Sequence, residues 1–298
     1  MFKALVKSMR LRTLPLSLAG VVCGGLLAQG EHGDNGWAFA LVLLTACALQ
    51  VLSNLSNEMG DHLSGVDSED REGPNYGMTD GGLTVKQMWR AINGTVVACC
   101  VIGLAMVLVS GSPWWVLLLG AAAIWAATHY TLGRKPYGYI GLGDLFVFIF
   151  FGLVSVLGSY FVVAHTIDFR IWLLAPAVGM GLLSVAVLNV NNIRDMQSDE
   201  GIRRTIPLRI GVRNARIYHT FLIVLGVASF FFAPVALARI VACCITVPFF
   251  VWHLYGVWTR EGRRLDPMLP LLVITTFVLA VLYSGVMPLL LGLLNSRP

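Results

Sequence analysis

Charged residues are scarce in this sequence. Only 12% of its 298 residues are Asp, Glu, Lys or Arg, whereas a water-soluble domain usually carries about 25%. Apolar residues make up 57%, and the mean hydropathy is +0.76. No water-soluble core needs this much apolar surface, so this composition excludes a soluble globular domain and indicates the lipid bilayer as the solvent.

Cysteine spacings typical of metal or redox sites are also missing. The six cysteines all lie in apolar runs, and no two of them form a CxxC pair. The sequence therefore offers no recognisable thiolate site. We expect these residues to act as small apolar packing groups.

Nine apolar segments are present, and each is close to the roughly 20 residues that cross a bilayer as a helix. They span residues 13–29, 37–57, 88–110, 114–132, 144–164, 170–190, 216–236, 239–258 and 268–293. The basic start before the first segment resembles a signal peptide, but the polytopic remainder favours a retained helix. We expect a single integral-membrane domain over residues 1–298. Its fold class is all-α, with about nine transmembrane helices in a bundle around a central cavity.

The basic residues sort to one side of this topology. Eighteen of the 21 Lys and Arg residues fall in the N-terminus and the even-numbered connections, and only Arg170, Arg239 and Arg297 fall on the other side. The positive-inside rule then places the N-terminus and the loops 58–87 and 191–216 in the cytoplasm, and the C-terminus outside. This sorting explains the net charge of +5 without a nucleic-acid partner.

Two polar stretches each follow an apolar segment on the predicted cytoplasmic side. Residues three, four and seven apart share one face of a helix. The first stretch has this spacing in Asn54, Asn57, Glu58, Asp61 and Gly65, and the second has it in Asn191, Asn192, Asp195 and Asp199. The repeated pattern Asn-x-x-x-Asp, four helices apart, suggests two four-helix halves. Ionisable groups at membrane depth are costly and seldom occur without a partner or a pathway.

Oxygen ligands without His or Cys suit Mg²⁺ or Ca²⁺. Mg²⁺ is commonly shared with substrate phosphates, so two such ligand sets favour a lipid-like substrate with a diphosphate. A solvated helix face is the alternative interpretation of either set alone. Within the acidic loop that follows the first set, Asp67 is the strongest further candidate. Nearby cations that suit a diphosphate are Arg71, Lys135, Arg194, Arg203 and Arg204.

The motifs Asn57-Glu58-x-x-Asp61 and Asp195-x-x-x-Asp199 resemble the paired aspartate-rich motifs of the UbiA superfamily of intramembrane prenyltransferases. The nine-segment topology is also similar, so the resemblance covers nearly the whole chain. The finer patterns at 54–74, 130–144 and 191–211 look like the branch that acts on 1,4-dihydroxy-2-naphthoate in menaquinone synthesis. Two positions depart from the family pattern: Glu58 replaces the usual Asp, and Gly65 replaces a common third carboxylate.

The resemblance implies transfer of a polyprenyl group from polyprenyl diphosphate to 1,4-dihydroxy-2-naphthoate, with loss of CO₂ and diphosphate, to give demethylmenaquinone. It implies Mg²⁺ as cofactor and a bacterial inner membrane as location. The implied metal ligands are Asn57, Glu58, Asp61, Asp67, Asn191, Asp195 and Asp199. The implied diphosphate-binding residues are Arg71, Lys135, Arg194 and Asn192. Asp61, Asp195, Lys135 and Tyr130 are the implied catalytic residues, with Tyr130 and Asn192 lining the aromatic or reacting end.

Two other functions stay open from the sequence. The same fold with another acceptor, such as 4-hydroxybenzoate, differs only in the identity of the product. A secondary transporter would use intramembrane carboxylates as coupling-ion sites, but here the carboxylates gather at one side rather than at the midplane.

Overall fold

The computed structural model describes residues 1–33, 35–65, 76–167, 169–232 and 237–286. Within these ranges the chain forms helices joined by turns, and no strand occurs. The all-α prediction is therefore confirmed.

The elements in chain order are α1 (Phe2–Ser8), η1 (Leu11–Thr13), α2 (Leu14–His32), α3 (Gly36–Ser64), α4 (Val85–Ser110), α5 (Val116–His129), α6 (Gly143–Val147), η2 (Phe148–Val154), α7 (Ser155–Ala164), α8 (Ile171–Arg194), α9 (Met196–Asp199), α10 (Ile206–Ser229), α11 (Leu237–Thr259), η3 (Gly262–Leu265), α12 (Met268–Val281) and η4 (Leu282–Val286). The α6, η2 and α7 elements follow one another without a break.

Seven helical segments among the described residues are long and apolar enough to cross a membrane. Two of the nine predicted spans are missing from these seven. The α5 helix has 14 residues and is a shorter apolar helix. The first half of α10 carries Arg209, Arg213 and Arg216, which lower its hydropathy. The prediction of about nine helices therefore fits a bundle in which two members are atypical.

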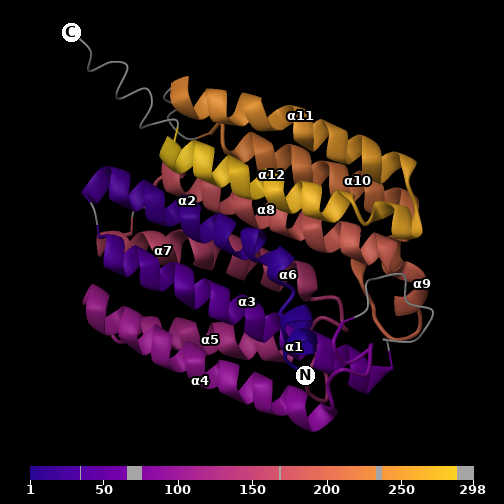
Figure 1. Cartoon of the computed structure of the whole chain (residues 1–298). Helices are drawn as coiled ribbons and strands as arrows, with labels where there is room; N and C mark the ends of the chain where they lie inside the picture. Colours follow the sequence, from indigo (N-terminus) through magenta and orange to yellow (C-terminus); the bar gives the residue numbers. More distant parts are fainter. Residues whose placement is uncertain (34, 66–75, 168, 233–236, 287–298) are drawn as a thin grey trace.

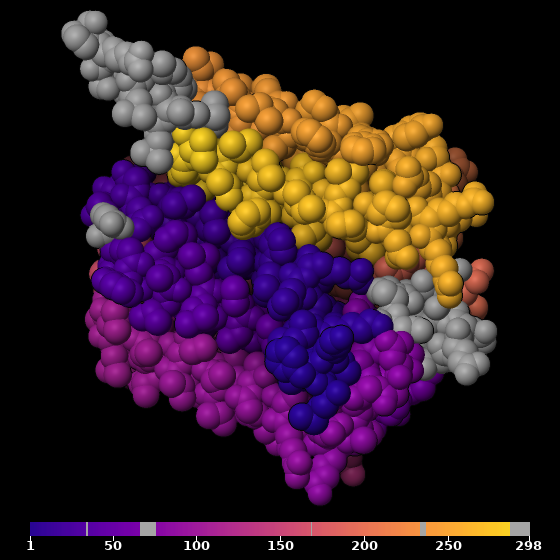
Figure 2. Space-filling view, viewed as in Figure 1, coloured from indigo at the N-terminus to yellow at the C-terminus, as the bar shows by residue number. Residues whose placement is uncertain are grey.

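The long helices lie side by side along one common direction (Figure 1). One end of the bundle collects the N-terminus, α1 and α9. The space-filling view shows the C-terminal helices packed along the N-terminal ones over the length of the molecule (Figure 2). Both polar stretches reach the same end, because α3 and α8 run toward it in the same direction. The sequence predicted this common side.

The connection after α8 differs from the predicted loop 191–216. A short helix, α9, follows α8 directly, and α10 already begins at Ile206. Pro207 favours this early start, because the first turn of a helix does not need the backbone N–H that proline lacks. Arg209, Arg213 and Arg216, which were assigned to that loop, consequently lie on α10, and Arg194 is the last residue of α8.

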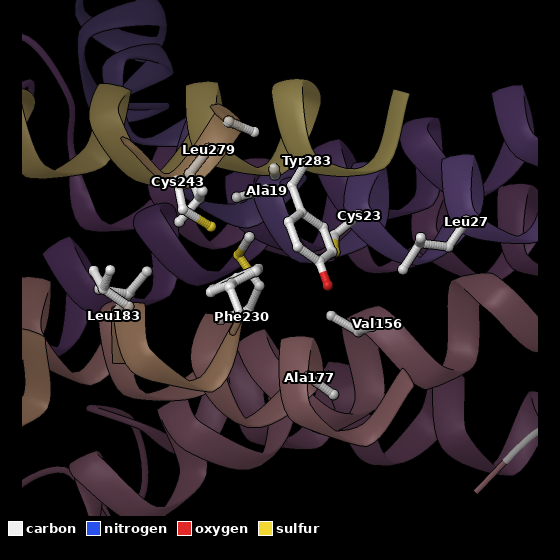
Figure 3. Close-up of a cluster of buried hydrophobic side chains, with 14 of the residues drawn as sticks. Ala19, Cys23, Leu27, Val156, Ala177, Leu183, Phe230, Cys243, Leu279 and Tyr283 are labelled. Atoms are coloured by element: carbon white, nitrogen blue, oxygen red, sulfur yellow. The ribbon is translucent and has the colours of Figure 1, made fainter. Parts of the chain in front are cut away.

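Close packing between α2 and α7 depends on two glycines one turn apart. A Cβ at Gly24 would lie 2.0 Å from the Val156 carbonyl oxygen, and one at Gly20 would lie 1.9 Å from Ser155 Oγ. Small residues at this spacing let membrane helices approach closely. Cys23, between them, is fully buried in the apolar core beside Val156 and Tyr283 (Figure 3). The expected packing role is confirmed for the buried Cys23, whereas Cys100 and Cys244 are exposed.

We expect Gly24→Leu to prevent α2 from seating against α7. Overpacking a core costs about 1–3 kcal/mol or more, and here the neighbour is backbone, which cannot move aside as a side chain can. Thermal unfolding of the detergent-solubilised protein measures the loss. Gly30→Leu is the control on the same helix, because a Cβ there meets nothing within 4 Å. Equal melting temperatures for the two variants would contradict the packing argument.

Candidate active site

A cavity of about 550 Å³ runs lengthwise through the N-terminal part of the bundle. Its wall on α3 extends from Asp61 to Val42, which corresponds to about 28 Å at a rise of about 1.5 Å per residue. One end carries amides and charges, namely Asn57, Asp61, Asn191, Asn192, Arg194 and Arg203. The remaining wall is mostly apolar. The cavity therefore joins one charged end to a long apolar interior.

The first polar stretch is helical as predicted, because α3 continues to Ser64. Asn57 and Asp61, one turn apart, both line the cavity. Glu58 is fully buried but outside the lining, and its Oε1 accepts a hydrogen bond from the Met78 backbone N–H at 2.7 Å. Successive helix residues point about 100° apart, so Glu58 leaves α3 in a different direction from Asn57. Because one of its carboxylate oxygens is bonded to the Met78 backbone, we leave Glu58 out of the proposed metal ligands.

The glycine before Asp61 allows the loop after α5 to pack against α3. A Cβ at Gly60 would lie 2.6 Å from the Thr131 carbonyl oxygen. From this position the Thr131 hydroxyl donates to the Ser56 carbonyl at 2.9 Å and to Asn57 Oδ1 at 3.3 Å. Gly60 thus brings the loop that carries Tyr130 and Tyr139 to the charged end of the cavity.

Arg203 connects the two polar stretches. Its Nη2 donates to Asp61 Oδ1, and its Nε lies 3.5 Å from Asp199 Oδ1. All three side chains are at least nine-tenths buried. Burial alone would lower the pKa of Arg203, but the carboxylates of Asp61 and Asp199 outweigh it and raise that pKa. The guanidinium therefore stays charged, and it brings carboxylates from α3 and α9 to one point.

The second polar stretch is not one continuous helix. The α8 helix ends at Arg194, and Asp195 leaves helical geometry before α9 begins. The carboxylate of Asp195 accepts two bonds from Arg194, both of 2.7 Å. Arg194 also donates to Asp266 at 2.8 Å and to Asn191 Oδ1 at 2.9 Å. The predicted single stripe of Asn191, Asp195 and Asp199 is thus divided between two arginines.

Some of the remaining predicted site residues line the cavity and others do not. Tyr130 and Asn192 line the cavity. Lys135 is exposed and does not belong to the lining, so the structure does not bring it to the site. Arg204 is also exposed. Asp67 and Arg71 lie outside the described residues.

Tyr139 is a site residue that the sequence analysis missed. Its hydroxyl donates to Asp61 Oδ1 at 3.0 Å. Burial and the nearby Asp61 carboxylate raise the pKa of Tyr139, so the hydroxyl keeps the proton that it donates. No local pattern could have indicated this contact, because it joins positions 78 residues apart.

Two further arginines, Arg10 and Arg12 from the N-terminal segment, also line the cavity. The Arg10 guanidinium stacks on the Tyr76 ring at 3.7 Å, and Arg12 donates to the Tyr76 hydroxyl at 2.8 Å. Arg10 has a left-handed backbone, with φ of 49°. Its buried Nε and Nη2 atoms have no hydrogen-bond partner among the described residues. The sequence analysis counted both arginines only as positive-inside residues.

Aromatic rings line the cavity next to its charged end. Tyr137 stacks on Phe146 with ring centroids 4.0 Å apart, and Tyr130 meets Tyr137 edge-on at 5.4 Å. Phe150 continues this row of rings. Ring faces carry partial negative charge and attract cations. The row therefore offers a water-poor surface on which positive charge is tolerated.

The donor set fits a divalent cation that is shared with phosphate. Among the described residues, no three His, Cys, Asp or Glu side chains form a ready metal site. Mg²⁺, however, is usually held by one or two carboxylates together with substrate phosphates. Asp61 and Asp199, which both reach Arg203, with the Asn57 amide nearby, match that pattern.

Comparison with known proteins identifies the fold and the family. Residues 17–267 match the model of the UbiA prenyltransferase family. The chain belongs to the UbiA prenyltransferase family. It is 45% identical to the 1,4-dihydroxy-2-naphthoate octaprenyltransferase of Escherichia coli over 74% of this chain and 73% of that one. It is 36% identical to the protein of the same name from Haemophilus influenzae, over 92% of each chain.

Solved structures of UbiA homologues share the fold at low sequence identity. The apo homologue from Aeropyrum pernix is 15% identical, with a TM-score of 0.70 over 90% of this chain and 96% of that one. The homologue from Archaeoglobus fulgidus, solved with DMAPP and Mg²⁺, is 13% identical, with a TM-score of 0.60 over 94% of this chain and 100% of that one.

We expect Arg203→Met to destabilise this UbiA-family protein strongly in metal-free buffer. Removing one partner of a buried ion pair costs about 3–5 kcal/mol, and this change leaves two carboxylates without their shared cation. Unfolding in detergent with a chelator present measures the effect. Arg204→Met is the matched control, because Arg204 is the exposed neighbour. Similar stability of the two variants would show that Arg203 does not hold the two stretches together.

Proposed function

We propose that this chain transfers a polyprenyl group from polyprenyl diphosphate to 1,4-dihydroxy-2-naphthoate, as the names of its Escherichia coli and Haemophilus influenzae relatives describe. The observation that carries the proposal is the cavity, which joins a charged end to an apolar interior of membrane depth. Such a shape suits a substrate with an anionic head and a long hydrocarbon tail.

The diphosphate binds at the charged end in this proposal. Asp61, Asp199, Asn57 and Asn191 would hold Mg²⁺, which supplies positive charge to the leaving diphosphate when it is bound. Arg203 and Arg194 both line this end of the cavity. They would donate to the outer diphosphate oxygens, and a guanidinium is well shaped for this task. Tyr139 keeps Asp61 oriented through its hydrogen bond.

The chemical step exchanges one bond for another. The allylic C–O bond breaks, and its electron pair leaves with the diphosphate. The electron-rich ring of the naphthoate then forms the new C–C bond to the allylic carbon. CO₂ departs with the C–C bond electrons returned to the ring. Because the acceptor exchanges CO₂ for the prenyl group, no net proton is gained or lost, and the immediate product is the quinol form of demethylmenaquinone.

The aromatic row protects the positive charge that develops on the prenyl group. Tyr130, Tyr137, Phe146 and Phe150 line the cavity beside its charged end. Their faces favour a cation, and their bulk excludes water that would capture it. Phe148, by contrast, packs on Gly181 and is not part of the lining.

The carboxylate of the acceptor requires a cation separate from those at the diphosphate. Arg194 and Arg203 are assigned to the diphosphate in this proposal, and their remaining bonds go to carboxylates of the protein. Arg10 is held in place by Tyr76, and two of its buried nitrogen atoms have no partner among the described residues. We therefore assign Arg10, supported by Arg12, to the acceptor carboxylate.

The proposal predicts Mg²⁺-dependent product formation in membranes that contain this chain. A polyprenyl diphosphate is supplied with 1,4-dihydroxy-2-naphthoate or with 4-hydroxybenzoate, and the products are identified by mass. Prenylated and decarboxylated naphthoate is the expected product. Excess chelator should abolish its formation. Asp61→Asn should lower the rate about a hundredfold or more, as loss of a transition-state charge contact commonly does.

The choice of acceptor decides between the open functions. Prenylated hydroxybenzoate without any naphthoate product would overturn the assignment of the acceptor but keep the family reaction. Transfer to neither acceptor would overturn both.

A second prediction concerns Arg10. Arg10→Gln should raise the KM for the naphthoate by about tenfold or more, because a hydrogen bond to a charged group contributes about 1.5–3 kcal/mol. The KM for the prenyl diphosphate should stay unchanged in steady-state assays. Lys7→Gln is the control, because Lys7 pairs with Asp80 at the surface. A raised KM for the prenyl diphosphate instead would move Arg10 to the diphosphate site.

A further inference from the structure

A second cavity, of about 540 Å³, lies at the charged end of the bundle. Its wall comes from the end of α8, from α9, from the first half of α10 and from the turn between α11 and α12, which lies at the same end as α9 (Figure 1). We call this cavity the basic pocket. Its charged lining residues are Arg194, Arg216, Glu261, Arg263 and Arg264. Arg194 also lines the candidate active site, so the two cavities share one side chain in their walls.

Positive charge is in excess in the basic pocket. Four of its described lining residues are arginines, and Glu261 is the one carboxylate among them. Arg194 is already offset by Asp195 and Asp266. Glu261 offsets little, because its side chain is 83% exposed and its closest approach to Arg216 is 3.5 Å. The arginines of the turn and of α10 therefore make the pocket attractive to an anion.

Arg216 is a fixed part of the pocket wall and not a loose surface side chain. It is only 13% exposed, and its Nη2 donates to the Arg260 carbonyl oxygen at 2.8 Å. This bond holds the guanidinium where α10 meets the end of α11. The buried Nε of Arg216 has no hydrogen-bond partner among the described residues. A buried donor without an acceptor costs free energy, and an anion beside Arg216 would provide that acceptor.

The depth of the basic pocket matches the level of lipid headgroups. Tyr255 and Trp258, in the last turns of α11, are 68% and 42% exposed. Tyrosine and tryptophan gather where the hydrocarbon of a bilayer meets its headgroups. The turn that carries Arg263 and Arg264 follows directly after α11. Basic pockets between membrane helices at this level suit phosphate headgroups.

We propose that the basic pocket binds a phosphate group, and that this group is the headgroup of an anionic phospholipid from the surrounding leaflet. Arg216 binds the phosphate from the buried side, and the exposed Arg264 binds it from the outside. Exposed apolar side chains of α10 and α11, such as Phe221 and Trp252, offer contact to the acyl chains. This apolar surroundings favours a lipid over a soluble phosphate. The site is separate from the proposed reaction and does not depend on it.

The test measures binding of phosphatidylglycerol to the full chain in detergent by native mass spectrometry. Phosphatidylcholine, whose headgroup has no net charge, is added in equal amount as the reference lipid. We expect the unmodified protein to retain phosphatidylglycerol in preference. Arg264→Gln should weaken binding of phosphatidylglycerol about tenfold, because hydrogen bonds between charged groups are the strong ones. Binding of phosphatidylcholine should not change.

Arg213→Gln is the matched control. Arg213 is an exposed arginine on α10, close in sequence to Arg216, but it does not line the basic pocket. The substitution removes the same formal charge as Arg264→Gln, so binding of phosphatidylglycerol should stay near that of the unmodified protein. Equal losses in the two variants would overturn the proposal, because the lipid would then respond to net charge and not to the pocket. Absence of any preference in the unmodified protein would overturn it as well.

A separate measurement distinguishes a lipid headgroup from a soluble anion. Inorganic diphosphate is added to the solubilised protein with a chelator, and the rise in melting temperature is recorded, since a ligand stabilises the folded state that binds it. If diphosphate stabilises the unmodified protein but not Arg264→Gln, and phosphatidylglycerol is not preferred, the pocket binds a soluble anion and the lipid assignment is wrong. Neither measurement uses prenyl transfer, so failure of the proposed function would leave both results unaffected.

Discussion

The site depends on one buried interaction, in which the guanidinium of Arg203 contacts the carboxylates of both Asp61 and Asp199. Asp61 lies in the last turn of α3, and Asp199 lies on α9, the short helix that follows α8. Two buried carboxylates repel each other strongly where water is scarce. Arg203 reaches both, so it removes this repulsion and fixes the two polar stretches at one end of the bundle. Gly60 and Thr131 then set the position of the intervening loop from the other side.

The cavity changes character in steps along its length. Charged and amide groups lie at one end, the aromatic row follows, and the remaining wall is mostly apolar. This order matches the parts of a prenyl diphosphate, from its anionic head through the reacting allylic carbon to the tail. A bilayer-depth interior can hold such a tail without exposing it to water, while the head stays at the rim where a polar acceptor arrives.

The sequence allowed good prediction of features with a local period. Apolar segments gave the spans, and the four-residue interval between Asn57 and Asp61 placed both on the cavity wall. The sequence did not allow prediction of contacts between residues that lie far apart along the chain. Tyr139 meets Asp61, and Tyr76 meets Arg10, and neither contact follows from spacing along one helix. The departure of Asp195 from helical geometry also escaped prediction. The pairing of Arg194 with Asp266, 72 residues away, is a tertiary contact that no local pattern indicates.

The charge balance at the site explains why the proposed reaction needs a divalent cation. Arg194 and Arg203 contact four carboxylates, those of Asp61, Asp195, Asp199 and Asp266. These two arginines are therefore outnumbered by the acidic groups that they contact, so the cluster of these six side chains is formally negative. A diphosphate is a multiply charged anion and would be repelled there. Divalent cations reverse the sign of the local field. In the proposed mechanism, Asp61 and Asp199 therefore repel a free diphosphate but would serve as ligands when it arrives with Mg²⁺.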